Sequence, residues 1–206
     1  LLSAWDSIGD QLVLDMYTPV GFKQGHAWLW TYLNKRTVPP AQKQLLDDFM
    51  AAVDLSPGWV DPKRLRIGQE LCQRAGLSSL IVLRDYCLMG GYESAAINKP
   101  LIYTGALKKG AVKRLTETVE FWVKIMKADA LSPDGEGLKH ILATRMIHSF
   151  SRVNILSRSD WDTNLWGVPL NLWDMLATNL GFSMVFLVGL RRMGLQPTAA
   201  EIDGLF

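Results

Sequence analysis

The chain has 206 residues, a length that is typical of one domain with a substantial core. Its 22 lysines and arginines nearly balance its 20 aspartates and glutamates, which argues against nucleic acid or an anionic membrane surface as a partner. Hydrophobic residues form 49% of the chain, with 8 Trp and 8 Met, and this share predicts a large apolar interior or a pocket for a bulky lipophilic ligand.

The start of the chain and its cysteines add two expectations. The sequence starts Leu1-Leu2-Ser3 without an initiator methionine, a basic segment or a signal cleavage site. We therefore expect a single domain over residues 1–206 that is part of a longer protein, and cytoplasmic and secreted locations both stay open. Cys72 and Cys87 match neither a metal-binding spacing nor a disulfide-rich scaffold, which predicts two buried thiols.

Helical spacing of apolar residues dominates the first half of the chain. Residues 6–17 show this spacing and stop before Pro19. Further helices are predicted over residues 25–34, from Pro39-Pro40 through residues 42–53, from Asp61-Pro62 to residue 75, and over residues 78–90. A loop is predicted around Asn98-Lys99-Pro100.

The second half continues the helical pattern, so the predicted fold class is all-α. A long helix is expected over residues 111–130, then the helix that contains His148, a tryptophan-rich loop over residues 160–169 and a helix over residues 171–193 that stops at Gly194. One more helix is expected from Pro197. The most apolar stretch, residues 175–190, has about 16 residues against the ~20 that a bilayer requires, which favours a core helix over a membrane span.

The predicted helix from His140 to Arg152 carries an unusual face. Residues three and four apart are neighbours on a helix, so Arg145, His148 and Arg152 share one face with aliphatic residues. Buried arginines are costly unless an anionic group meets them. This face therefore predicts paired charges around an imidazole that could bind a metal.

Four local patterns in the C-terminal half carry a family resemblance. They are Arg114-Leu-Thr-Glu-Thr118, Arg145-Met-Ile-His148-Ser-Phe-Ser-Arg152, Trp161-Asp162 with Trp166-Gly-Val-Pro169-Leu-Asn171-Leu-Trp-Asp174, and the apolar run from Phe182 through Gly189 to Gly194-Leu195. In this order they resemble the haem-dependent oxygenase family that contains bacterial latex clearing protein, a rubber oxygenase, and fungal endoplasmic-reticulum-bound oxygenases.

The resemblance implies a fold, a cofactor and a reaction. The fold would be a globin-like helical core with extra helices that holds haem b, with His148 as the axial ligand of the iron. The enzyme would insert dioxygen across the C=C bond of a lipophilic substrate, of the polyisoprene or terpenoid class, and give carbonyl products. Dioxygen and this alkene would be the partners of the chain.

The same resemblance gives expected roles to the arginines and to one threonine. Arg145 and Arg152, on either side of His148, would pair with the haem propionates or with buried acids such as Asp174. Arg114 and Thr118 would be catalytic, because an arginine and a hydroxyl at this spacing can donate hydrogen bonds to dioxygen.

The sequence departs from the family at one position. In latex clearing protein a lysine stands directly before that threonine and caps the iron in a closed state, whereas this chain has Glu117. A carboxylate is a different iron ligand or none, so closure by a lysine does not carry over to this chain.

Other interpretations of the same residues stay open. Arg114 and Thr118 could be a solvated helix face with Glu117 and Glu120, and the other two arginines could form structural salt bridges. His26 has no partner pattern and is interpreted as structural, and His140 as exposed near the start of a helix. A haem peroxidase or sensor, or a non-enzymatic helical protein that binds haem or an apolar ligand, is the alternative function.

Overall fold

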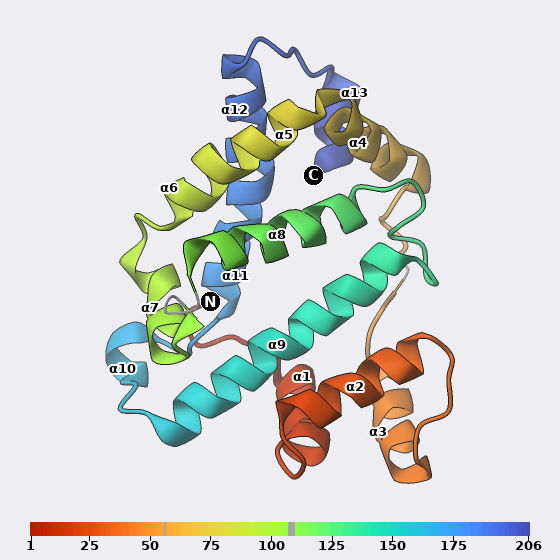
Figure 1. Ribbon diagram of the computed structural model, residues 1–206, viewed down its shortest axis with the longest axis vertical. Helices are drawn as coiled ribbons and strands as arrows, with labels where there is room; N and C mark the ends of the chain where they lie inside the picture. Colours follow the sequence, from red (N-terminus) through yellow and green to blue (C-terminus); the bar gives the residue numbers. More distant parts are fainter. Residues whose placement is uncertain (56, 107–109) are drawn as a thin grey trace. The chain divides into compact units, whose positions relative to one another are not determined.

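The computed structural model describes residues 1–55, 57–106 and 110–206, and all regular secondary structure in these ranges is helical (Figure 1). The predicted all-α class is therefore confirmed. The residues fall into two compact units, Leu1–Leu55 with Lys139–Leu172 and Ser56–Leu138 with Trp173–Phe206. The single domain expected over residues 1–206 stays a prediction.

The first unit contains the N-terminal helices and most of the long helix α9. Its elements are α1 (Ser7–Leu12), the π-helical turn η1 (Val13–Tyr17), α2 (Phe22–Leu33), α3 (Pro40–Ala51), α10 (Thr163–Trp166) and the part of α9 (Glu136–Arg158) that begins at Lys139. Local chemistry sets two of these starts, because Asp6 caps α1 and Pro40 stands in the first turn of α3. Apolar side chains of α1, η1, α2, α3 and α9 are buried, among them Val13, Leu29, Leu46, Phe49, Met146 and Ile155.

The second unit contains the remaining helices. They are α4 (Pro62–Ala75), α5 (Leu77–Val82), the π-helical turn η2 (Leu83–Leu88), α6 (Met89–Gly91), α7 (Ala95–Tyr103), α8 (Ala111–Ile125), α11 (Leu172–Leu180), the π-helical turn η4 (Gly181–Val185), α12 (Phe186–Arg192) and α13 (Ala199–Leu205). Asp61 caps α4 through the Lys63 N–H, and Thr198 with Glu201 forms a reciprocal cap at the start of α13.

An apolar core joins helices of the second unit. It contains Leu71, Cys72, Ala75, Val82, Leu83, Cys87, Trp122, Phe186, Leu187 and Leu190. The two cysteines are buried free thiols, as predicted. Burial raises the pKa of both thiols to about 12, so they stay protonated and unreactive at neutral pH.

Two glycines bring α4 and α13 into close contact. A Cβ atom on Gly68 would lie 2.1 Å from the carbonyl oxygen of Gly204, so only glycine permits this approach of the two backbones. Ion pairs of 2.7 Å flank the crossing, from Arg64 to Asp203 and from Arg74 to Glu201. The last helix is thereby fixed to α4 by shape and by charge.

Three predicted features differ from the structure. The loop expected around Asn98-Lys99-Pro100 is wrong, because Pro100 lies within α7. Asn98 Nδ2 donates to the carbonyl oxygens of Tyr92 and Ser94, which supports the start of this helix around the proline. The tryptophan-rich loop contains the short helix α10. The helix expected to reach residue 130 ends at Ile125, because Met126 leaves the helical conformation with φ −89° and ψ 2°.

The apolar helix near the C-terminus is longer than the stretch counted from the sequence. The helical run Leu172–Arg192 has 21 residues and a mean hydropathy of 1.4 in its most apolar window, of which 22% is buried. By length and composition alone it could cross a membrane. Phe186, Leu187 and Leu190 are buried in the core of the second unit, as the prediction of a core helix requires, while Met184 and Val188 are exposed.

Candidate functional site

The long helix α9 presents the predicted Arg, His and Arg face. Arg145, His148 and Arg152 follow one another at spacings of three and four residues, so they lie along one side of an unbroken helix. Met146 and Ser149, which are fully buried, anchor this stretch in the first unit. The site is therefore built on a rigid element.

Arg145 is held by the aspartate that starts α1. Its Nε lies 2.6 Å from Asp6 Oδ2, and its Nη2 lies 2.7 Å from Asp6 Oδ1, which is a bidentate ion pair. Asp6 also accepts the N–H of Gly9 at 2.9 Å, so one carboxylate caps α1 and binds α9. Burial alone would raise the pKa of Asp6, but hydrogen bonds from Arg145 and Gly9 lower it below its ordinary value.

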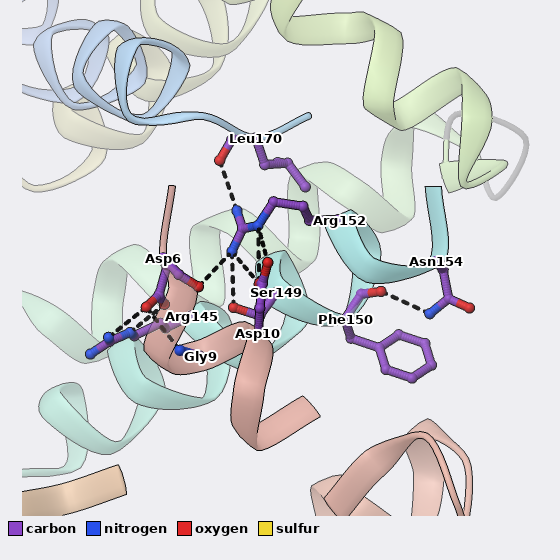
Figure 2. Close-up of polar contacts among 9 residues, drawn as sticks. All are labelled: Asp6, Gly9, Asp10, Arg145, Ser149, Phe150, Arg152, Asn154 and Leu170. Carbon is purple, nitrogen blue, oxygen red and sulfur yellow. Dashed lines mark hydrogen bonds and ion pairs between the residues drawn. The ribbon is translucent and has the colours of Figure 1, made fainter. Parts of the chain in front are cut away.

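Arg152 is enclosed more completely. Its side chain is 2% exposed, and its Nη2 lies 2.7 Å and its Nε 2.9 Å from the carboxylate oxygens of Asp10. Nη2 also donates to Ser149 Oγ at 3.1 Å, and Nη1 donates to the Leu170 carbonyl at 2.9 Å. Figure 2 shows the guanidinium surrounded by these three partners and by the Asp6 carbonyl, which accepts from Nη2 at 3.4 Å. The positive charge of Arg152, which would be costly to bury unpaired, is therefore fully compensated.

The loop that supplies the Leu170 carbonyl is tied to the N-terminal segment. Val168 N–H donates to the Leu2 carbonyl at 2.9 Å, and Leu172 N–H donates to the Ala4 carbonyl at 2.8 Å. Between them, Leu170 has a left-handed φ of 54°, an uncommon conformation for a residue other than glycine. The loop is thus fixed at both ends around the carbonyl that accepts from Arg152.

A glycine allows α1 to approach α9 beside His148. A Cβ atom on Gly9 would lie 2.5 Å from Ser149 Oγ and 2.4 Å from Asp6 Oδ2. Both distances are shorter than van der Waals contact, so a larger residue would push the two helices apart. Asp6, Gly9 and Asp10 therefore form one surface of α1 that fits the site face of α9 by shape and by charge.

His148 lies between the two ion pairs and is half-buried. Its ring takes part in no hydrogen bond within the described ranges. Burial, reinforced by the positive charge of Arg152 and opposed by Asp6, lowers the pKa of His148 to about 4. The imidazole is consequently neutral at physiological pH, with a ring nitrogen available to accept a proton or to bind a metal ion.

Arg114 and Thr118 belong to α8 in the second unit, and both are half-buried. The Arg114 guanidinium lies over the Tyr92 ring at 5.9 Å, and its buried Nε has no hydrogen-bond acceptor among the described residues. The Thr118 hydroxyl donates to the Arg114 carbonyl at 2.9 Å. Glu117 is exposed and lies 3.8 Å from Lys113, so its carboxylate belongs to the outer face of α8.

The other two histidines belong to an aromatic cluster of the first unit. His26 stacks on Phe22 with ring centroids 4.8 Å apart and accepts the indole N–H of Trp30 at 3.1 Å, in keeping with its interpretation as structural. His140 packs edge-on against Trp30 at 4.8 Å and is half-buried, which corrects its expected exposure. Within the described ranges, no group of three His, Cys, Asp or Glu side chains could hold a metal ion.

Sequence reasoning missed the acidic residues of α1. The structure pairs Arg145 with Asp6 and Arg152 with Asp10. The available signal was Asp6 and Asp10 at a spacing of four, which places two acids on one face of an apolar helix. Pairing across more than 130 residues is not visible in a local pattern.

The fold is all-α and carries a neutral histidine on a rigid helix. Cofactor-dependent enzymes are among the proteins with these two features. Residues 73–206 match the family described as ER-bound oxygenase mpaB/B'/rubber oxygenase, catalytic domain, so the chain belongs to this oxygenase family. The resemblance inferred from the four motifs is confirmed. No curated protein and no solved structure matches the chain significantly.

Proposed function

We propose that this chain is a haem b-dependent oxygenase that inserts dioxygen across a C=C bond of a lipophilic substrate. The observation that carries the proposal is the neutral imidazole of His148, unbonded among the described residues, between two compensated arginines. Membership of an oxygenase family supports the oxygen chemistry, and the rubber oxygenases of this family support a polyisoprene or terpenoid alkene as the substrate. The C=C bond breaks and each carbon receives one oxygen atom of dioxygen, so two carbonyl groups form without an external reductant.

His148 is the proposed axial ligand. Haem b, when bound, would supply the redox-active iron on which dioxygen is activated. An imidazole binds iron only when the coordinating nitrogen is unprotonated, and the lowered pKa of His148 provides this form at neutral pH. The donor at this position therefore fits the cofactor.

The arginines contribute to the proposed cofactor site in different ways. Arg145 has 28% of its side chain exposed, so it keeps a surface that a propionate can reach in addition to Asp6. Arg152 is enclosed by Asp10, Ser149 and Leu170, and all three of its nitrogens already donate. We propose that Arg152 serves the cofactor by fixing α9, while Arg145 is the candidate for direct pairing with a propionate.

Arg114 and Thr118 are the proposed catalytic residues. The Nε–H of Arg114 is a buried donor without an acceptor in the described ranges, and a buried donor gains free energy when a ligand oxygen accepts from it. Thr118 is oriented through its bond to the Arg114 carbonyl, which leaves its oxygen lone pairs free to accept. Arg114 would polarise dioxygen or a developing carbonyl, and Thr118 would orient the same partner.

The cofactor proposal is tested by reconstituting the protein with haem. We expect a Soret band, a positive pyridine haemochrome assay, and the loss of both after gel filtration of the His148→Ala variant. His140→Ala is the matched control on the same helix and should retain haem, because its ring packs against Trp30. Absence of haem from the wild-type protein, or full retention by His148→Ala, would refute the proposed ligand.

The reaction is tested on a panel of polyisoprenes and terpenoid alkenes with isotopically labelled dioxygen. Products trapped as alcohols by borohydride should carry one labelled oxygen on each cleaved carbon when measured by mass spectrometry. Arg114→Ala should bind haem and lower kcat/KM by about 100-fold, the scale for losing one donor to developing charge. Lys113→Ala, exposed on the same helix, is the control, and equal rates for the two variants would exclude Arg114 from catalysis.

A further inference from the structure

The two acids of α1 each form an ion pair with one of the two arginines that flank His148 on α9. Asp6 and Asp10 are four residues apart on α1, and their partners precede His148 by three residues and follow it by four. The two ion pairs therefore bracket the histidine along the helix axis. Both acids lie outside residues 73–206, which match the oxygenase family.

We propose that Asp6 and Asp10 are positioning residues that fix the direction of the His148 imidazole toward the iron. They act through Arg145 and Arg152, which set the rotation and the height of α9 against α1. This inference rests on the proposed function, in which His148 is the axial ligand. It assigns the N-terminal helix to the same site as the motif of α9.

The geometry explains why two pairs are needed. A single ion pair leaves a helix free to turn about that contact, whereas two pairs about two turns apart on α9 prevent rotation and sliding together. Arg152 adds directional bonds to Ser149 and to the Leu170 carbonyl, and the fork of a guanidinium tolerates little change in angle. Gly9 sets the distance between α1 and α9, because its hydrogen faces Ser149, the residue next to His148.

The two ion pairs also enclose the proposed ligand along the helix, because Arg145 and Arg152 are held on either side of His148. Groups that orient and polarise a ligating histidine commonly change metal affinity by about 10- to 100-fold when they are replaced. A brace that only stabilised the fold would leave these ligand properties unchanged.

The test uses the haem-loaded chain and three charge-removing variants. Asp6→Asn and Asp10→Asn keep the shape of the side chain and an acceptor oxygen but lose the charge. Asp15→Asn is the matched control, since Asp15 lies on η1 and accepts only from the exposed Gln11 amide in the described structure. The readouts are the iron–histidine stretching frequency in resonance Raman spectra of the ferrous protein and the rate of haem transfer to apomyoglobin.

We expect Asp6→Asn and Asp10→Asn to shift or broaden the iron–histidine band and to release haem about tenfold faster. Asp15→Asn should match the wild-type protein. The charge-exchanged variant Asp6→Arg/Arg145→Asp should recover the wild-type band more closely than Asp6→Arg alone. If Asp10→Asn does not fold, Asp6→Asn decides the outcome, because its ion pair is a quarter exposed and less costly to lose.

Two results would overturn the inference. Wild-type Raman bands and haem release in Asp6→Asn and Asp10→Asn, together with lower unfolding midpoints, would make the acids a structural brace only. A wild-type protein that binds no haem, or a His148→Ala variant that retains it, would overturn the proposed function and the positioning role with it. The two failures are distinguishable, since only the second affects the unmodified protein or the His148 variant.

Discussion

The buried pair between Arg152 and Asp10 gives the largest stability effect that we predict. In Asp10→Ala the guanidinium of Arg152 keeps its charge, has almost no access to water and loses the carboxylate that binds it at 2.7 Å. Leaving one member of a buried pair uncompensated costs about 3–5 kcal/mol. A typical domain is stable by about 5–15 kcal/mol, so the variant should lose a large part of its free energy of unfolding.

The assay is urea unfolding followed by far-UV circular dichroism on the wild-type chain and its variants. Lys43→Ala is the control, because Lys43 and Asp47 are exposed by 60% and 37% and such a pair contributes at most about 1 kcal/mol. Replacing both buried partners, in Asp10→Leu/Arg152→Met, should recover part of the loss because no unpaired charge remains. An Asp10→Ala variant no less stable than Lys43→Ala would refute the buried ion pair.

Two further predictions concern pH and packing. Because unfolding returns the pKa of His148 from about 4 to its ordinary 6.5, the unfolded chain binds a proton in this window that the folded chain does not. Stability of the haem-free protein should therefore fall by up to about 3 kcal/mol as pH decreases from 6.5 to 4, at 1.36 kcal/mol per pKa unit; an equal slope of the urea midpoint in His148→Gln would contradict this. Gly68→Ala should cost about 1–3 kcal/mol, because its methyl group would overlap the backbone of Gly204. Gly90→Ala, whose Cβ meets open space within a helix, should instead be neutral or stabilising in the same thermal unfolding assay.

The local part of the site could be predicted from the sequence. Arg145, His148 and Arg152 share a face because helix geometry relates residues three and four apart, and the turn residues that bound α9 are visible nearby. The helical class follows from the same periodicity. The Gly194 stop was also predictable, and the structure gives this residue a φ of 88° that glycine adopts easily.

The remaining features depend on contacts that no local pattern encodes. Asp6 and Asp10 reach their arginines across 139 and 142 residues of chain. Pro100 lies inside α7, where the usual effect of proline predicts a break, and Asn98 binds carbonyls that precede this helix. The π-helical turns η1, η2 and η4 each accommodate one extra residue without ending the helix, which the apolar periodicity does not predict.

The family match and the ion pairs of the site cover different parts of the chain. The matched residues 73–206 contain His148 and Arg152 but not Asp10, which neutralises Arg152. Arg152 is 1% exposed, and its guanidinium cannot remain buried without the negative charge of Asp10. The helix α9 therefore keeps its observed surroundings only when α1 is present. The first unit independently joins these segments, because Leu2 and Ala4 bind the loop that carries Leu170. The N-terminal segment is therefore part of the framework that any ligand of His148 would meet, although the family match begins after it.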